Sequence, residues 1–257
     1  MGPGFLSPGQ GKDDRRERGA ERIPGRMKFF STLKAERCLT QLLSERDPAS
    51  PEGRKALESL RSIGPDAIPK VIEAFATADK EHSGAMVTLL ASLLDDKTFP
   101  LFTAGLGHTD KLCVAGVTKA LAISANYDTN RLTELLGRPE IFKPALIEIL
   151  GIVRKRLNAR ELLKRAYDLE PREKAAVFKI IGDIAGADLV PDLIARIEGK
   201  DPSVRLNIIE LLSRFNQPEV ARALERQLKD KNKMVRKAAL EALAAMPGDR
   251  DIGLICS

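Results

Sequence analysis

A step of 30 to 31 residues separates seven apolar positions, and it constrains the fold more than any other feature of the sequence. The step is 30 residues three times and then 31 residues three times. Apolar columns repeat at the same step three and six residues before these anchor positions and nine residues after them. A fixed period of this length indicates a repeat array, in which each unit buries its apolar face only against its neighbours. The anchor positions are Ile63, Leu93, Ile123, Val153, Ile184, Phe215 and Met246.

Each period reads as a pair of helices joined by turns. Apolar residues at offsets of seven, six, three and zero residues before the anchor fall on one face of a helix. Asp201-Pro202 supplies a capping side chain and a proline where such a helix begins. No alternating strand pattern competes, so the sequence predicts an all-α solenoid of about seven helix pairs. The column five residues before the anchor is always polar, and we predict that it faces water: Glu58, Thr88, Thr118, Glu148, Lys179, Glu210 and Glu241.

The two ends of the chain differ from the periodic part. Residues 1–26 are rich in Gly, Pro and charge without periodicity, which predicts a disordered tail, and Met27 is the expected native start. Residues 27–257 form the expected array, which opens with an amphipathic helix that can cap the stack. Residues 247–257 match the opening of another repeat and then stop. We therefore expect the array to be truncated at its C-terminal end and to be a fragment of a longer protein.

The composition favours closely stacked aliphatic helices. Hydrophobic residues make up 43% of the chain, whereas aromatic residues make up 4% and Trp is absent. The net charge is +6, and six basic and four acidic side chains place +2 of it in residues 1–27. The array itself mixes both signs, unlike the dense basic footprint of a dedicated nucleic-acid binder. We therefore expect most of the charged side chains to lie on the solvated surface of the helices.

The cysteines argue against a disulfide framework or a zinc site. Cys38, Cys113 and Cys256 are odd in number, far apart and form no CxxC pair. This usage favours a reducing compartment, so we expect a cytoplasmic location. We also expect Cys38 and Cys113 to be small apolar packing residues. The longest apolar stretch, Ala145 to Val153, is interrupted by Glu148 and is too short to span a membrane.

Two segments near the C-terminus carry a recognisable motif. Residues 201–212 and 230–243 each combine an Asp in the turn between helices with a Val-Arg pair at the start of the second helix. The pairs are Val204-Arg205 and Val235-Arg236. Both segments resemble HEAT repeats of the short, phycobilisome-lyase-like type, in which these marks recur in each unit.

The resemblance covers roughly residues 50–257 by period, but only about residues 185–257 by motif. At the position of Arg205, the earlier units have Gly53, Ser83, Cys113, Lys143 and Lys174. The resemblance implies a right-handed superhelix of helix pairs, an armadillo-type fold, whose concave surface usually carries partner contacts. It does not imply one function, since such arrays serve many roles.

No catalytic constellation is visible. HEAT-type hydroxylases that bind a di-iron centre use repeated His-Glu pairs, but neither His82 nor His108 is followed by Glu. We expect both to be surface or turn residues. HEAT-like DNA glycosylases need aromatic stacking, for which the chain offers only Tyr127 and Tyr167 as tyrosines and no Trp. Phosphate-binding, dinucleotide-binding and nucleophile-elbow motifs are also missing, so we predict no enzyme activity, no cofactor and no metal.

A basic cluster follows the fourth anchor and is the densest in the chain. It has two interpretations: a solvated basic edge, or a contact for an acidic partner or for phosphate groups. We treat a second basic group, within residues 229–237, as a solvated turn. The candidate partner contacts are Arg154, Lys155, Arg156, Arg160, Lys164, Arg165 and Lys179.

These observations favour a non-catalytic scaffold or adaptor that binds a protein partner. It would be one section of a larger cytoplasmic bacterial protein, such as the regulatory section of a signalling protein. The alternatives are a nucleic-acid-associated protein that uses the basic edge, or a bilin lyase-type enzyme. We expect no membrane contact and no small-molecule substrate. The N-terminal units diverge from the family motif and are rich in Ala and Gly, so specialised contacts are expected there.

Overall fold

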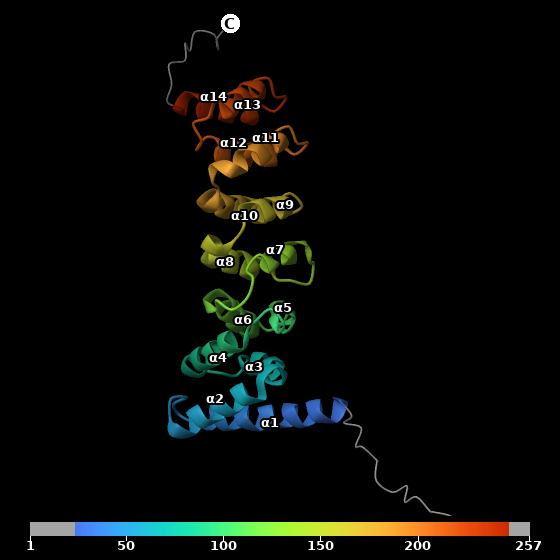
Figure 1. Cartoon of the computed structure of the whole chain (residues 1–257), viewed down its shortest axis with the longest axis vertical. Helices are drawn as coiled ribbons and strands as arrows, with labels where there is room; N and C mark the ends of the chain where they lie inside the picture. The colour runs from blue at the N-terminus through green and yellow to red at the C-terminus, as the bar shows by residue number, and fades with distance from the viewer. Residues whose placement is uncertain (1–23, 247–257) are drawn as a thin grey trace, which may run out of the picture.

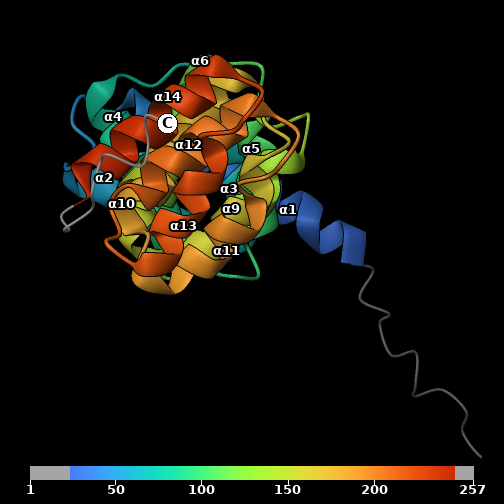
Figure 2. The same ribbon diagram turned by 90° about the horizontal axis from the view of Figure 1, so that it is seen from above.

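The computed structural model describes residues 24–246, and all regular structure in this part of the chain is helical. Helices α1 to α14 follow one another as seven pairs that stack into a tall column, with α1 at one end and α14 at the other (Figure 1). Seen from above, the pairs overlie one another, and α1 projects from the stack (Figure 2). The predicted all-α solenoid is thus confirmed, whereas its handedness stays a prediction.

The first helices of the pairs form one layer of the stack. They are short apart from α1, and α7 has only four residues. The first helices are α1 (Pro24–Ser44), α3 (Ile68–Ala74), α5 (Phe99–Leu106), α7 (Arg131–Glu134), α9 (Ala159–Ala166), α11 (Val190–Arg196) and α13 (Pro218–Gln227).

The second helices form the other layer, in which each one packs on the second helix of the next pair. Short 3-10 turns connect some helices: η1 (Gly64–Ala67), η2 (Leu135–Gly137), η3 (Arg154–Arg156) and η4 (Ala187–Leu189). The second helices are α2 (Pro51–Ile63), α4 (Lys80–Leu93), α6 (Lys111–Ile123), α8 (Lys143–Val153), α10 (Pro171–Ile184), α12 (Pro202–Leu212) and α14 (Lys233–Ala245).

Side-chain caps fix where most second helices begin. The carboxylate of Asp79 accepts hydrogen bonds from the second and third backbone N–H groups of α4, and Asp110 does the same for α6. Asn232 caps α14 in this way, and Asp201 caps α12 by accepting from the Ser203 backbone N–H alone. Such caps satisfy N–H groups that have no partner within the helix. Gly64 ends α2 with a φ of 73°, a left-handed backbone that favours glycine.

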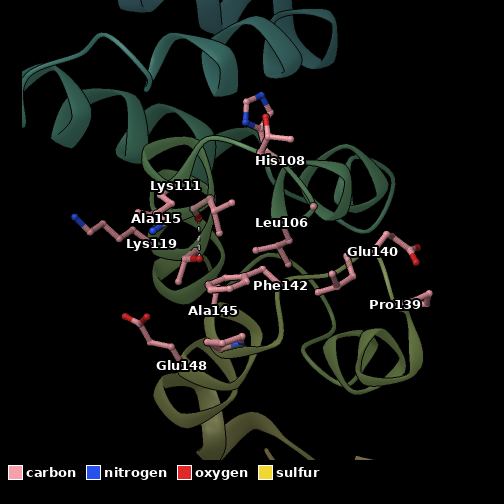
Figure 3. Close-up of a pocket in the computed structure, with 16 residues that line it drawn as sticks. Leu106, His108, Lys111, Ala115, Lys119, Pro139, Glu140, Phe142, Ala145 and Glu148 are labelled. Atoms are coloured by element: carbon pink, nitrogen blue, oxygen red, sulfur yellow. Dashed lines mark hydrogen bonds between the residues drawn. The ribbon is translucent and has the colours of Figure 1, made fainter. Parts of the chain in front are cut away.

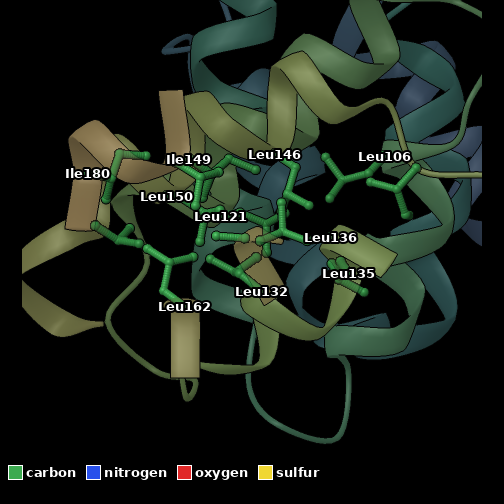
Figure 4. Close-up of a cluster of buried hydrophobic side chains, with 14 of the residues drawn as sticks. Leu106, Leu121, Leu132, Leu135, Leu136, Leu146, Ile149, Leu150, Leu162 and Ile180 are labelled. Atoms are coloured by element: carbon green, nitrogen blue, oxygen red, sulfur yellow. The ribbon is translucent and has the colours of Figure 1, made fainter. Parts of the chain in front are cut away.

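The core runs continuously through the stack as columns of aliphatic side chains. Leu121, Leu132, Leu146 and Leu150 meet from three helices in its middle (Figure 4). Each such side chain contributes about 1.5–3 kcal/mol when fully buried. The column three residues before the anchors is buried in every period: Leu60, Leu90, Ala120, Leu150, Ile181, Leu212 and Leu243.

Three details of the sequence interpretation need correction. The anchors lie at or just beyond the ends of the second helices and are less buried than the column before them, and Ile123 is 60% exposed. Thr118 was expected to face water, but it is buried, and its hydroxyl is satisfied by donating to the Val114 carbonyl oxygen at 2.8 Å. His82 was expected at the surface, yet the first turn of α4 buries it, with Nδ1 2.8 Å from Asp79 Oδ1.

Other predictions fall partly outside the described residues. Cys38 and Cys113 are buried free thiols that pack in the core, as expected, whereas Cys256 lies outside the described range. So do most of the predicted tail and the partial repeat of residues 247–257. The first helix begins at Pro24, three residues before Met27. No helix among the described residues combines the length and the apolar character needed to cross a membrane.

Candidate functional site

Two grooves flank α6 on the layer of second helices. The α6–α8 groove encloses about 580 Å³ between Ala115 and Lys119 of α6 and Phe142 and Ala145 at the start of α8 (Figure 3). The α4–α6 groove encloses about 430 Å³ on the other side of the same helix and is also lined by Ala115 and Lys119. Helix α6 is therefore a ridge between two hollows, and Ala115 faces both.

Small side chains keep these grooves open. Ala115 and Ala145 line the α6–α8 groove, and Gly84 and Gly116 line the α4–α6 groove. A Cβ atom at Gly116 would lie 2.5 Å from the ring of Phe75, so this position cannot carry a side chain without moving a core residue. Larger side chains on neighbouring helices would interlock as ridges and grooves and fill this space.

One wall of the α6–α8 groove is formed by the chain that follows the short helix α7. After it, residues 138–142 run back against the end of α5, where the Phe142 N–H donates to the Leu106 carbonyl oxygen at 3.2 Å. This approach requires Gly107, because a Cβ atom there would lie 2.9 Å from the Glu140 carbonyl oxygen. Lys143 braces the segment by donating to the Leu135 and Arg138 carbonyl oxygens, and burial lowers the pKa of its ammonium group.

Two large apolar side chains stand exposed beside the grooves. Leu112 lines the α4–α6 groove and is 56% exposed, and Phe142 lines the α6–α8 groove and is 53% exposed. Ile123 and Ile152, at the ends of α6 and α8, are also exposed. Large apolar side chains that are exposed beside a groove are candidates for contact with another molecule.

The charged side chains on α6 are all positive. Lys111 and Lys119 are its charged side chains, and Lys80 lines the α4–α6 groove from the adjacent helix. Within the described residues, none of the three forms an ion pair. Asp79 is occupied by helix capping: the His82 backbone N–H, then the His82 ring, lower the pKa of its carboxyl.

The site offers contact surfaces rather than reactive groups. His108 lines the α6–α8 groove, but its Nδ1 accepts the Asp110 backbone N–H at 3.0 Å. Cys113 is buried, and burial raises the pKa of its thiol, which disfavours the reactive thiolate. In residues 24–246, no group of three or more His, Cys, Asp or Glu side chains is placed to hold a metal ion.

The predicted basic cluster lies further along the stack, and its arginines connect neighbouring repeats. Arg156 donates to the carbonyl oxygens of Ser124 at 2.7 Å and Tyr127 at 3.2 Å, about one repeat earlier. Arg160 reaches forward, with Nε 2.7 Å from Asp192 Oδ2. These side chains hold the solenoid together, a use that the sequence interpretation missed.

The remaining candidates of this cluster differ in their surroundings. Arg154 Nε lies 3.6 Å from Asp183 Oδ2, and Lys164 pairs with Glu161 on its own helix at 2.7 Å. Lys155, Arg165 and Lys179 are exposed and have no hydrogen bond or ion pair within the described chain. Their contact with a partner stays a prediction. The grooves at α6 contain none of the predicted contact residues.

The family marks near the C-terminus also connect repeats. Lys174 Nζ lies 2.7 Å from Asp201 Oδ2 of the next repeat. This contact, together with hydrogen bonds from Ser203, lowers the pKa of Asp201 to about 2. Arg205 Nε lies 2.7 Å from Asp230 Oδ2 one repeat on. Burial raises the pKa of Asp230, but hydrogen bonds from the Asn232 N–H and Arg205 outweigh it, so the net shift is downward.

Comparison with known proteins places the repeats in a family. Residues 159–252 match the family model described as HEAT repeats. Among the curated proteins, no match was found. The comparison with solved structures returned human deoxyhypusine hydroxylase in complex with glycerol, at 18% identity over 86% of this chain and 98% of that one, with a TM-score of 0.39.

Designed armadillo repeat proteins are also similar. One is 18% identical over 82% of this chain and 99% of its own, with a TM-score of 0.23. Another, in complex with the peptide (KR)4, is 17% identical over 82% and 98%, with a TM-score of 0.24. These scores are too low to transfer a site or an activity. The family match identifies residues 159–252 as HEAT repeats, and the same stacking of helix pairs continues through the rest of the described chain.

Proposed function

We propose that the chain is a non-catalytic scaffold that binds a segment of a partner protein in the two grooves flanking α6. The observation that carries the proposal is the exposure of Leu112 and Phe142 beside hollows lined by small residues. Grooves that are largely preformed and mostly apolar are the usual form of binding sites. In this role the chain would act as an adaptor or as the regulatory section of a signalling protein.

The energetics require more than these two side chains. Both are already about half buried, so covering the rest contributes about 0.8–1.5 kcal/mol each, half of the value for complete burial. A micromolar complex needs about 8 kcal/mol. The partner must therefore also fill the grooves and use the charged groups at their rims.

The basic cluster gives less support to a nucleic-acid role. Arg154, Arg156 and Arg160 are held by carboxylates and carbonyl oxygens of neighbouring repeats. A phosphate backbone is bound by cations that are free to replace the counterions condensed on the nucleic acid. The exposed apolar side chains at α6 have no use in such a contact, so we favour a protein partner.

A site-specific crosslink tests this proposal. A photoreactive residue replaces Leu112, and the same residue replaces Met234 on α14 as a control, because their exposed fractions match at 56% and 57%. In cells, we expect irradiation to attach one defined polypeptide at position 112 and not at position 234. Equal adducts at both positions, or no polypeptide adduct at position 112, would contradict the proposal.

A further inference from the structure

We propose that the partner segment is acidic and amphipathic, with aliphatic side chains in the grooves and carboxylates that meet Lys80, Lys111 and Lys119. This inference rests on the proposed function, since it specifies the chemistry of the segment that binds there. It follows from the charge of α6, from the position of its lysines, and from the absence of competing carboxylates on the α4 side.

Helix α6 carries only positive charge. Its two lysines are separated by eight residues, and its sequence contains neither Asp nor Glu. Every other second helix carries at least one acidic residue. These residues are Glu52 and Glu58 in α2, Glu81 in α4, Glu148 in α8, Glu173 and Asp183 in α10, Glu210 in α12 and Glu241 in α14.

Two of the lysines occupy positions that the helices themselves disfavour. Lys80 and Lys111 are the first residues of α4 and α6, where the helix dipole already presents positive charge. A cation in that turn is unfavourable by about 0.3–1 kcal/mol. The neighbouring carboxylates of Asp79 and Asp110 face the backbone N–H groups that they cap. A carboxylate from a partner would relieve the repulsion at both helix starts.

The two grooves differ in the charge that opposes these lysines. In the α6–α8 groove, Glu140 and Glu148 line the side away from α6, and Figure 3 shows them pointing outwards around the hollow. In the α4–α6 groove, Asp79 is the acidic residue of the lining, and its carboxylate is occupied by capping. The acidic side of the segment should therefore lie over the α4–α6 groove, which Lys80 and Lys119 line, and reach across the start of α6 to Lys111, which lines the other groove.

Elsewhere in the stack the fold itself uses comparable cations. Lys174 pairs with Asp201, and Arg205 pairs with Asp230. Arg236 donates to the carbonyl oxygens of Asp230 and Lys231. The lysines around α6 have no such partner within the described chain, so they are available to another molecule.

The test measures the binding of three synthetic peptides to the full chain by fluorescence anisotropy. Each peptide is a labelled 16-residue helix with Leu at helical spacing, and the flanking positions carry Glu, Gln or Lys. We expect the Glu peptide to bind at least tenfold more tightly than the Gln peptide at low salt, with the advantage shrinking as salt rises. The Lys peptide should bind most weakly.

Variants of the chain assign the preference to α6. Lys119→Glu should weaken the binding of the Glu peptide at least tenfold and strengthen the binding of the Lys peptide. Lys55→Glu makes the same charge change on α2 and should alter the binding of neither peptide. Ala115→Arg should block both grooves and abolish binding of all three peptides. Circular dichroism confirms that each variant keeps its helices.

The outcomes separate this inference from the function beneath it. Equal binding of the three peptides, lost on Ala115→Arg, would overturn the acidic preference and leave the docking grooves standing. Binding that is absent, or that is indifferent to Ala115→Arg, would overturn the docking proposal itself. Self-association in sedimentation that Ala115→Arg abolishes would identify a second copy of the chain as the occupant and overturn the acidic partner.

Discussion

The two halves of the solenoid use the same architecture with different residues at equivalent places. From α9 to α14, the step is 31 residues, the family model matches, and Lys174 and Arg205 link each turn to an Asp in the next. From α3 to α8, the step is 30 residues, and the positions equivalent to Arg205 hold Ser83, Cys113 and Lys143. Where the family's polar links are absent, small residues open grooves and lysines remain unengaged.

The N-terminal half is still held together by polar contacts, but these run between loops. Arg131 Nη1 lies 2.6 Å from the Asp96 carbonyl oxygen, and its guanidinium stacks on the Phe99 ring at 4.4 Å. Arg156 similarly reaches Ser124 and Tyr127. Because these links run between loops, the second helices of this half do not depend on them, as the proposed binding surface requires.

The largest expected effect concerns the ion pair between Arg205 and Asp230, the kind of contact that the second helices of the N-terminal half lack. The side chains of Arg205 and Asp230 are only 11% and 9% exposed, so Asp230→Ala would leave a nearly buried guanidinium without its carboxylate. Loss of one partner from such a pair destabilises by about 3 kcal/mol or more. Urea unfolding measures the change. Asp183→Asn, at the half-exposed pair with Arg154, should cost less than about 1 kcal/mol. Similar losses of unfolding free energy for Asp230→Ala and Asp183→Asn would show that the buried pair is no more important to stability than the half-exposed one.

A pair of glycine substitutions tests the small-residue packing of the N-terminal half. Gly116→Ala should destabilise by about 1–3 kcal/mol, because its Cβ would press on the buried ring of Phe75. Gly151→Ala in α8 meets open space and should stabilise by up to about 1 kcal/mol through helix propensity. Urea unfolding of both variants measures the two changes in unfolding free energy, which should have opposite signs. A neutral or stabilising Gly116→Ala would show that α6 is not held tightly against α3.

The contact between Lys174 and Asp201 should make the stability of the C-terminal half sensitive to acid. The pKa of Asp201 is lowered to about 2 by Lys174, whereas an unfolded Asp titrates near about 3.9. A lowered folded-state pKa adds stability above the unfolded value, and this stability is lost as the pH falls from about 4 towards 2. The carboxylate is 45% exposed, so solvent screening keeps the loss below about 1 kcal/mol. Thermal unfolding of Lys174→Met should show a shallower pH dependence than the wild type; parallel curves would refute the pairing.

The smallest effect on stability is expected at the grooves. Leu112→Ser removes an exposed side chain and should change the unfolding free energy by no more than about 0.5 kcal/mol. Leu90→Ala, at a fully buried position of the adjacent helix, should cost about 2.7–5 kcal/mol. Urea unfolding of both variants provides the comparison. A large loss for Leu112→Ser would mean that this residue supports the fold rather than a partner.

The repeat period predicted the fold because burial recurs at fixed offsets from the anchors. Leu60, Leu90 and their equivalents lie in the core as expected. Exposure at single positions was harder to predict, as Thr118 and Ile123 show, because it depends on the separation between neighbouring helices. The basic cluster misled for a related reason: Arg156 and Arg160 find their partners about one repeat away, which charge density along the sequence does not reveal.

The grooves left a weak signal in the sequence. The lack of acidic residues in α6 and the glycine at position 116, where other repeats have larger side chains, are both readable from the repeat columns. The Ala- and Gly-rich composition of the N-terminal repeats did point to this half. The run of residues 138–142 against the end of α5 was not predictable, because it depends on Gly107 and on a backbone contact between two repeats.

Hydrogen exchange of the full chain with and without the acidic peptide tests the central claim most directly. The claim is that a partner segment binds at α6, whereas α9 to α14 serve the stack. It predicts slower exchange on binding at residues 78–87, 106–119 and 139–148, with α9 to α14 unchanged. Protection confined to α9–α14, or no protection anywhere at saturating peptide, would contradict it.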